Sequence, residues 1–241
     1  MIQSVDRALR VLAVLQGARR RSLGEIATAL GLAPSTVHGI VRTLLAHGMV
    51  VQERDTGLYR LGPATLRLGN VYLDNLELRA HAQPWIDDLA ERTGCAVRVA
   101  VPLSDDVVVV ACAPTPAEVG IVVPAHACAL GKVLLAHHAC VLPERPRRMT
   151  GETRLVPDLG PVRRTGLATE VEEAVLGECG LAAPVATADE VCGAVGLVVP
   201  AGDWPVPAST VDALRAAARA VSRELGAPDW PPHHADDAAT A

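Results

Sequence analysis

The sequence contains no phenylalanine, only two tyrosines and three tryptophans, and a single lysine among its 22 basic residues. Its six cysteines form no CxxC pair, which excludes the common zinc-knuckle and dithiol redox motifs. No apolar run approaches the roughly 18–20 residues that span a bilayer. The first ten residues also lack the apolar centre of a signal peptide. These absences predict a cytoplasmic protein whose cysteines behave as small buried side chains.

The short motifs of common catalytic and nucleotide-binding sites are missing as well. The chain has no HExxH, GxSxG, Walker or GxGxxG motif. The histidine pairs His137-His138 and His233-His234 lack partners at metal-ligand spacing. We therefore expect no metal, no cofactor and no catalytic residue.

Charge is distributed unevenly along the chain. The net charge of −5, taken alone, argues against binding to nucleic acid. Residues 1–68, however, carry nine arginines against four carboxylates, a net charge of +5, and the remaining residues carry −10. Half of the residues are apolar, so the chain can bury a substantial core. The pattern predicts a basic N-terminal domain followed by an acidic domain.

Three amphipathic helical patterns fall within the first 48 residues. Ser4 is positioned to cap the first of these helices. The run Ser22-Leu23-Gly24-Glu25 predicts a capping box that opens the second helix, and Gly31 closes it. Pro34 then occupies the first position of a third helix, which ends at Gly48. A short helix, a tight turn and a second amphipathic helix predict a helix-turn-helix.

Two short strands follow the third helix. Residues 49–54 and 58–61 flank the turn Asp55-Thr56-Gly57, which predicts a hairpin, or wing. The helix over 34–47 is then the recognition helix, and residues 19–21 form a mobile basic loop that attracts phosphates. Hydroxyl groups at a helix N-terminus suit phosphate contact, and arginine reaches phosphates or guanine edges. The residues expected to contact DNA are Ser22, Ser35, Thr36, His38, Gly39, Arg42, Thr43, Arg54 and Arg60.

A second helical region joins the two domains. Residues 64–81 are apolar on more than one side, which predicts a linker helix that also contacts a second copy of the chain. Pro84 is expected to interrupt this helix before another one that runs to Gly94. We place a winged helix-turn-helix at 1–62, the linker helix at 63–80, a C-terminal domain at 81–226 and a disordered Pro-rich tail at 227–241.

The acidic domain mixes strands with helices. Runs rich in β-branched residues predict strands over 95–102, 105–114 and 119–124, and two more within 180–200. Helical spacing is found over 129–137, near 159–165 and over 208–225. The fold class is therefore α/β, of the α+β type.

Two polar features of this domain leave alternatives open. Lys132, in a Gly-Lys step near a helix start, either holds an anion or extends its ammonium to the surface. Glu170, Glu172 and Glu173 form either a solvated or binding cluster or a general-acid pair. An enzyme with a DNA-binding appendage would use these residues, and a constitutive interaction module would have no ligand site at all.

Several longer segments are similar to the IclR family of bacterial transcription regulators over about Gln3 to Gly226. These are SVDRALRVLAVL, SLGEIATALGLAPSTVHGIVRTLLAHGMV with YRLG, AHACALGKVLLA at 125–136 and EEAVLGECGLAAPV at 172–185. Within that family, TVHGI and LRLGNVYLDNLELRA resemble the actinobacterial glycerol-operon regulator branch. The resemblance implies a repressor with a GAF-like effector-binding domain, an operator in double-stranded DNA, a small-molecule metabolite effector, and homodimers that pair into tetramers. It places the effector against Ala129, Leu130, Glu170, Gly180, Gly196 and Val198.

This chain departs from the family pattern at the expected pocket. Gly180 replaces a cysteine, and Gly196 and Val198 replace small hydroxyl residues, so hydrogen-bond partners for a small carboxylate are lost. We therefore expect an effector that is larger or less polar than a two- or three-carbon oxoacid. In the recognition helix Gly39 replaces an arginine, which leaves more of the DNA contact to Arg42 and the hydroxyls.

Overall fold

The computed structural model describes residues 2–18, 20–137 and 139–230. The chain divides into two compact units, Met1–Asn75 and Leu76–Ala241, and each is considered by itself below. The division falls inside the segment where the sequence predicts a linker.

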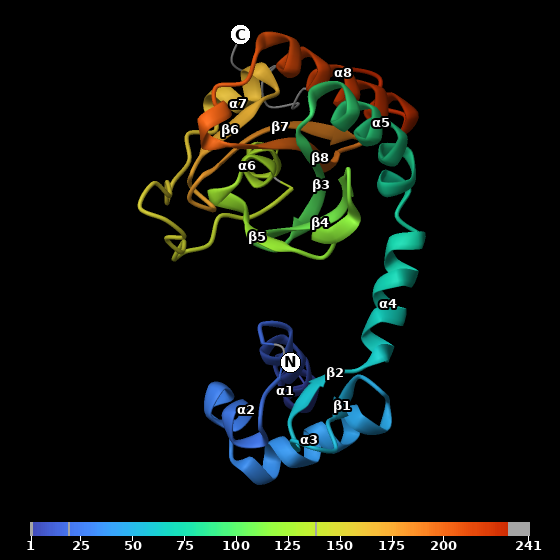
Figure 1. The fold of residues 1–241 in the computed structure, drawn as a ribbon, viewed down its shortest axis with the longest axis vertical. Coiled ribbons are helices and arrows are strands. Elements are labelled where there is room, and N and C mark those ends of the chain that lie inside the picture. Colours follow the sequence, from blue (N-terminus) through green and yellow to red (C-terminus); the bar gives the residue numbers. More distant parts are fainter. Residues whose placement is uncertain (1, 19, 138, 231–241) are drawn as a thin grey trace. The chain divides into compact units, whose positions relative to one another are not determined.

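The first unit is a helical domain with a small hairpin (Figure 1). Ser22 opens its second helix with a capping box: the Glu25 N–H donates to Ser22 Oγ at 3.2 Å, and the Ser22 N–H donates to Glu25 Oε2 at 2.7 Å. Gly31 closes this helix in the left-handed region, with φ of +64°. Both features confirm the sequence prediction. The elements of the unit are α1 (Gln3–Gln16), α2 (Leu23–Leu30), α3 (Pro34–Ala46), β1 (Val50–Gln52), β2 (Tyr59–Leu61) and α4 (Pro63–Asp74).

The prediction for the start of α1 is wrong. The helix begins at Gln3, its N-cap is Ile2, and no side chain caps it. Ser4 therefore lies inside the first turn and not at the N-cap position, from which a side chain accepts hydrogen bonds from the unpaired N–H groups of the first turn. The core of the unit includes Val11, Ile26 and Val37, which are fully buried, whereas Val5 and Leu9 on α1 are exposed.

The wing is a two-stranded hairpin, and an isolated β-bridge joins it to Arg21 in the segment that precedes α2. In the hairpin β1 and β2 are antiparallel, with Val50 opposite Leu61. The Arg21 N–H donates to the Tyr59 carbonyl at 2.9 Å, and the Tyr59 N–H donates to the Arg21 carbonyl at 2.7 Å. The sequence predicted that Arg21 belongs to a mobile loop. This prediction is wrong, because the backbone of Arg21 is hydrogen-bonded to Tyr59. Arg19 lies outside the described residues.

The helical break between the units also differs from the prediction. Helix α4 ends at Asp74, and Leu76 is extended before α5 (Glu77–Thr93) begins. Pro84 lies inside α5 and does not interrupt it. The loss of one backbone N–H there is offset because Ile86 and Leu89, on the same helix, are buried in the core of the second unit.

The second unit is built on a six-stranded antiparallel sheet with the strand order β5-β4-β3-β8-β7-β6. The short edge strand β6, with four residues, was missed in the sequence, because it is short and includes Glu170 of the acidic cluster. The strands are β3 (Ala96–Leu103), β4 (Asp106–Ala113), β5 (Val122–Pro124), β6 (Ala168–Val171), β7 (Glu178–Ala186) and β8 (Val191–Pro200), with the single turns η1 (Pro116–Glu118), η2 (Ala125–Ala127) and η3 (Ala201–Asp203).

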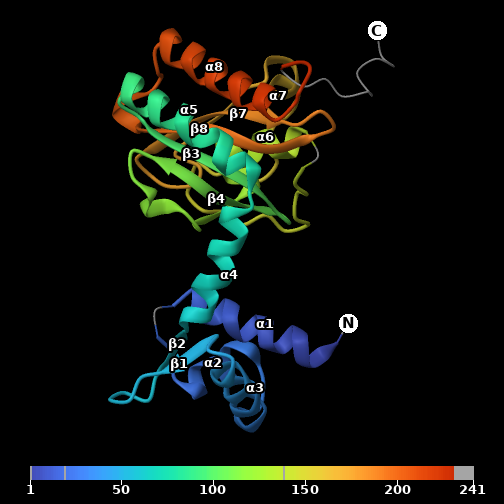
Figure 2. The same ribbon diagram turned by 90° about the vertical axis from the view of Figure 1, so that its right-hand side faces the viewer.

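Helices cover both faces of this sheet. In Figures 1 and 2, α5 and α8 (Ala208–Glu224) lie side by side on one face, whereas α6 (Ala129–Ala136) packs on the other with α7 (Gly160–Thr165) beside it. All eight residues of α6 are buried. A Cβ at Gly131 would lie 2.2 Å from the Ala125 backbone, so only glycine permits this packing. Mixed helices and strands in this arrangement confirm the predicted fold class.

The segment after α8 begins in contact with the second unit. The Trp230 Nε1–H donates to the Pro184 carbonyl at 2.9 Å, and the Arg219 guanidinium lies 5.6 Å from the indole centroid. The prediction of disorder is therefore wrong for residues 227–230, while residues 231–241 lie outside the described residues. Among the helices that the structure describes, none is both long and apolar enough to cross a membrane.

Candidate DNA interface and ligand cavity

The exposed face of α3 carries the side chains predicted to contact DNA. Ser35, His38 and Arg42 are exposed, and Thr36 is half-buried. The Thr43 hydroxyl donates to the Gly39 carbonyl at 3.2 Å, so its oxygen is left as an acceptor. The opposite face packs into the core of the unit, so α3 presents one polar surface to solvent.

Ser22 has a structural task as well. Its hydroxyl accepts the Glu25 N–H in the capping box, and it is half-buried at the start of α2. The sequence predicted both the cap and a DNA contact for this residue. The cap is confirmed, and the DNA contact stays a prediction.

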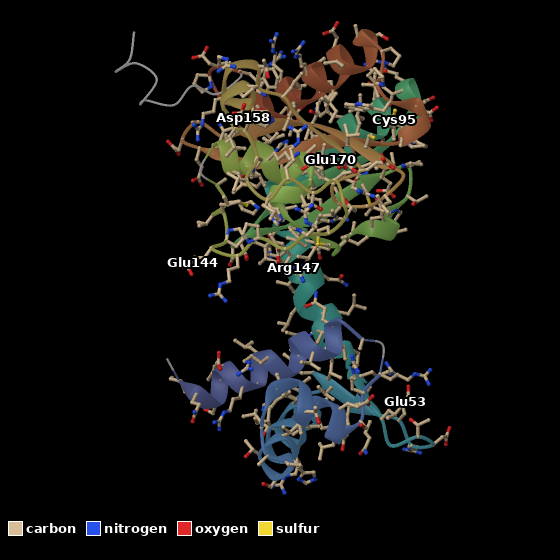
Figure 3. All side chains as sticks on the ribbon, turned by 90° about the vertical axis from the view of Figure 1, so that its left-hand side faces the viewer. Glu53, Cys95, Glu144, Arg147, Asp158 and Glu170 are labelled. Atoms are coloured by element: carbon tan, nitrogen blue, oxygen red, sulfur yellow. The ribbon has the colours of Figure 1, made fainter. Side chains whose placement is uncertain are left out.

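A carboxylate that the sequence did not single out organises the wing cations. Arg20 Nε lies 3.1 Å from Glu53 Oε1, and Arg60 Nε lies 3.7 Å from the same atom. Figure 3 labels Glu53 on the hairpin. Arg54, next to Glu53 in the chain, is exposed. The wing therefore holds two of its cations beside an acid.

The second unit contains a cavity of about 350 Å³ on the face of the sheet that α6 covers. Glu170 on β6 is paired with Gly180 on β7, which is in turn paired with Val198 on β8, so the three residues form one row across the sheet. The lining residues are Arg98, Val107, Val109, Glu118, Ile121, Val122, Val123, Pro124, Cys128, Ala129, Leu130, Met149, Glu170, Ala174, Val175, Glu178, Gly180, Leu181, Leu197 and Val198. Five of the six residues predicted to contact an effector are thus brought together here.

Gly196, the sixth predicted residue, is not among the lining residues. It lies behind Leu130, since a Cβ at Gly196 would lie 3.0 Å from Leu130 Cδ2. At Gly180 a Cβ would lie 3.1 Å from Glu170 Cγ and 3.4 Å from Ala129 Cβ. The two glycines therefore let α6 and Glu170 approach the sheet closely.

Glu170 is a buried carboxylate at the wall of this cavity (Figure 3). Its Oε2 accepts the Glu173 backbone N–H at 2.9 Å. Burial raises the pKa of Glu170 despite this hydrogen bond and the positive charge of Lys132 nearby. A buried carboxylate of this kind gains from a ligand that donates a hydrogen bond to it.

The sequence left two alternatives for Lys132, a surface lysine or an anion site. The structure supports neither of them. Its ammonium donates to Glu173 Oε1 at 2.6 Å and to the Thr169 carbonyl at 3.0 Å, and the side chain is 6% exposed. Glu173 also accepts the Arg154 backbone N–H at 3.1 Å. Glu173 does not act as a general acid either, because its carboxylate is held in the buried ion pair with Lys132.

The loop before α7 is tied to the same acidic segment. The hydroxyls of Thr150 and Thr153 donate to the carbonyls of Glu172 and Glu173 at 2.6 and 2.7 Å. Met149, at the start of this stretch, lines the cavity. One segment thus contributes to the cavity wall and supports the ion pair.

A second charged group in the cavity was missed in the sequence. Arg98 on β3 donates from Nε and Nη2 to the two Glu118 oxygens at 2.7 and 2.6 Å, and Nη2 lies 3.7 Å from Glu178 Oε2. Burial alone would lower the pKa of Arg98, but its hydrogen bond and charge interactions with these glutamates raise it overall. The available signal was one arginine in the apolar run CAVRVAVP.

The cysteines all lie in the second unit. All six cysteines are free thiols; four are buried, and Cys95 and Cys192 are half-buried. Burial raises the pKa of Cys128, in the cavity wall, to about 12, so it stays a neutral thiol. Within the described ranges no three His, Cys, Asp or Glu side chains gather in a way that could hold a metal ion, and His138, His233 and His234 lie outside those ranges.

A winged helix and a cavity-bearing α/β unit on one chain define the class of one-component transcription regulators. Residues 4–54 match the family model of the IclR helix-turn-helix domain, and residues 70–223 match that of the bacterial transcriptional regulator IclR C-terminal domain. The chain belongs to the IclR family of bacterial transcriptional regulators. The named relatives are transcriptional regulators and not enzymes.

Named relatives and solved structures agree with this assignment. The glycerol operon regulatory protein of Streptomyces coelicolor is 40% identical, covering 94% of this chain and 97% of the relative. A crystal structure of an IclR regulator from Alicyclobacillus acidocaldarius is 26% identical, with a TM-score of 0.77, covering 94% of this chain and all of the other. An IclR homologue from Microbacterium hydrocarbonoxydans, complexed with 4-hydroxybenzoate, is 25% identical, with a TM-score of 0.74, covering 92% of this chain and 98% of the other.

Proposed function

We propose that the chain is a cytoplasmic repressor whose affinity for an operator is set by a small organic molecule in the cavity of the second unit. The observation that carries this proposal is the cavity itself, which is apolar over most of its wall and lies in the same chain as a winged helix. A ligand changes DNA affinity only if it binds one arrangement of the protein better than another. The name of the Streptomyces relative and the ligand of the Microbacterium homologue support this kind of control.

The DNA contacts follow from the shape of the first unit. Helix α3 enters the major groove with Arg42 on a base edge or phosphate, and the wing places Arg54 and Arg60 on the flanking backbone or minor groove. Ser35 and Thr36 contact phosphate from the helix N-terminus. Ser22, His38, Gly39 and Thr43 complete the proposed interface.

The effector contacts follow from the cavity. The ligand contacts Ala129, Leu130, Glu170, Gly180 and Val198. Gly196 contributes indirectly, because its missing side chain allows Leu130 to pack close to the sheet. The cavity volume of about 350 Å³ is within the range of sites for ring-sized molecules. It therefore favours an effector larger than a two- or three-carbon oxoacid.

A homodimer is the proposed working unit. Helix α4 has 12 residues and buries no side chain, and four of its large apolar side chains are exposed, namely Leu66, Leu68, Val71 and Tyr72. Isolated helices shorter than roughly 12–15 residues are only marginally stable in water. Packing against α4 of a second copy covers these side chains and brings two recognition helices to a two-fold operator, on which dimers then pair into tetramers.

The DNA assignment is tested by footprinting the purified full-length chain on genomic DNA, with and without candidate metabolites. Arg42→Ala should lose the footprints and keep its response to ligand in a thermal-shift assay. Arg164→Ala, which removes the same charge from α7, is the matched control and should keep both. Footprints that survive Arg42→Ala overturn the assignment of α3, and footprints that never respond to any metabolite favour a constitutive DNA-binding protein.

The dimer is tested by sedimentation of the full-length chain. Tyr72→Asp should shift the chain toward monomer, because a charge is then placed in the proposed interface. Val156→Asp places the same charge at another exposed apolar position and should leave the assembly unchanged. Equal sedimentation of all three proteins overturns the proposed interface.

A further inference from the structure

The cavity has more carboxylates than cations. Its charged lining residues are Arg98, Glu118, Glu170 and Glu178, one cation against three acids. The remaining wall is made mostly of valine, leucine, isoleucine and alanine side chains. A ligand therefore meets an apolar surface with several hydrogen-bond acceptors.

The single cation is already occupied. Arg98 holds both oxygens of Glu118 in a bidentate pair at 2.7 and 2.6 Å, and Glu178 lies 3.7 Å from its Nη2. The hydrogen bond from Arg98 lowers the pKa of Glu118, so this acid is ionised at neutral pH. An anionic ligand would have to displace Glu118 from Arg98 and leave it, with Glu178, next to another negative charge.

The acids are placed where one ligand can reach more than one of them. Glu178 and Gly180 are two residues apart on β7 and so face the same side of the sheet, about 7 Å apart along the strand. Gly180 is paired with Glu170 on β6. The carboxylates of Glu170 and Glu178 thus rise from adjacent strands into one cavity, and the absent side chain at Gly180 lets the Glu170 side chain lie close over the sheet between them.

We propose that the cavity selects a neutral or cationic small molecule, whose hydroxyl or ammonium groups donate hydrogen bonds to Glu170 and Glu178, and that it discriminates against carboxylates and phosphate esters. The inference rests on the proposed function only in taking this cavity as the effector site. A donor on the ligand replaces the water that Glu170 has lost on burial, whereas an anion adds repulsion without a free cation to balance it.

Three probes that share one ring and differ in charge test the proposal. 4-Hydroxybenzoate, 4-hydroxybenzyl alcohol and 4-hydroxybenzylamine are titrated into the full-length chain by calorimetry at neutral pH and fixed salt. The alcohol and the amine are expected to bind at least about tenfold more tightly than the carboxylate, a difference of about 1.4 kcal/mol. A carboxylate that binds most tightly, or no binding by any probe at millimolar concentration, overturns the proposal.

A charge-removing variant shows whether the acids cause the preference. Glu178→Gln should weaken the amine several-fold, strengthen the carboxylate, and change the alcohol least. Glu144→Gln, in an exposed loop and not part of the cavity lining, should leave all three affinities unchanged (Figure 3). Unchanged affinities of Glu178→Gln for both the amine and the carboxylate overturn the role of this acid.

DNA footprinting with the same probes separates this inference from the proposed function. A carboxylate that binds most tightly and also alters the footprints overturns the ligand class and leaves ligand-controlled regulation intact. If the footprints stay unchanged when the alcohol or the amine is bound, that probe is not an effector. The preference of the cavity for neutral or cationic ligands is then still shown by the order of affinities.

Discussion

Lys132 Nζ lies 2.6 Å from Glu173 Oε1, and the two side chains are 6% and 4% exposed. The pair links α6, in the centre of the second unit, to the acidic segment after β6. Since Arg154 Nε is 3.8 Å from the same oxygen and is itself well exposed, it offers little compensation if the lysine is lost.

Lys132→Met is therefore expected to destabilise the second unit strongly. It leaves the Glu173 carboxylate buried with only the exposed Arg154 guanidinium nearby, and breaking one side of a buried pair typically costs about 3–5 kcal/mol. Chemical unfolding of the full-length chain measures the loss. The double variant Lys132→Met with Glu173→Leu should recover much of it, because neither charge is then buried alone. A single variant as stable as the parent would contradict this view of the pair.

Glu170→Gln should change the pH dependence of stability. Burial raises the pKa of Glu170, so the folded state favours its protonated form. The contribution of this group to stability is thus complete below its ordinary pKa and declines as pH rises through the raised value. Glutamine removes that decline, so the melting temperature of the variant should exceed that of the parent at about pH 8 and match it at about pH 4. Glu152→Gln, an exposed control, should give no pH-dependent gap, and an equal gap at both pH values would be inconsistent with the assignment.

Ser22→Ala should loosen α2. Loss of an N-cap hydroxyl typically costs about 1 kcal/mol. Hydrogen exchange of the α2 amides should therefore be several-fold faster, and operator binding should weaken because α2 supports the recognition helix. Ser22→Asp keeps a capping oxygen and is expected to retain protection. Equal exchange in the alanine variant and the parent would show that the capping box contributes nothing.

Glu53→Gln should strengthen binding to DNA at low salt. The change frees Arg20 and Arg60 from a shared carboxylate, so both become available to phosphates. We expect a several-fold gain in affinity and a steeper dependence on salt, by about one additional phosphate contact. Asp55→Asn removes the same charge at the tip of the wing without releasing either arginine. If both variants gain equally, overall charge and not release of the cations is responsible.

Most local features of the fold, the Ser4 cap excepted, could be predicted from the sequence, and several features set by distant contacts could not. The Ser22 capping box and the left-handed Gly31 depend on a few neighbouring residues, so their sequence signals were sufficient. The helix break at Leu76 was misplaced to Pro84, because burial of Ile86 and Leu89 stabilises α5 across the proline.

The same division holds for the candidate site. Family resemblance led to Glu170 and Gly180, and the sheet register then placed them side by side. The pairing of Arg98 with Glu118 joins a strand to a turn 20 residues away, and Glu178 comes from another strand. Nothing in the local spacing indicates which of the many acids this arginine meets. Burial of Lys132 was missed for a related reason, because α6 is covered on every side and has no polar face to reveal its orientation.

The glycines at 180 and 196 have a consequence for how ligand preference can evolve. Glu170, Ala129 and Leu130 lie close to the sheet because two strands carry no side chain there, and the strands themselves are held by backbone pairing that other residues also satisfy. A methyl group at Gly180 would meet Glu170 Cγ at 3.1 Å, which a small movement of that side chain can accommodate, whereas one at Gly196 would also meet the Leu181 backbone carbonyl at 3.0 Å. Single substitutions can therefore reshape the cavity while the winged helix stays the same. Under the proposed function, such a substitution would change the ligand preference of the second unit without altering the DNA-contacting face of the first.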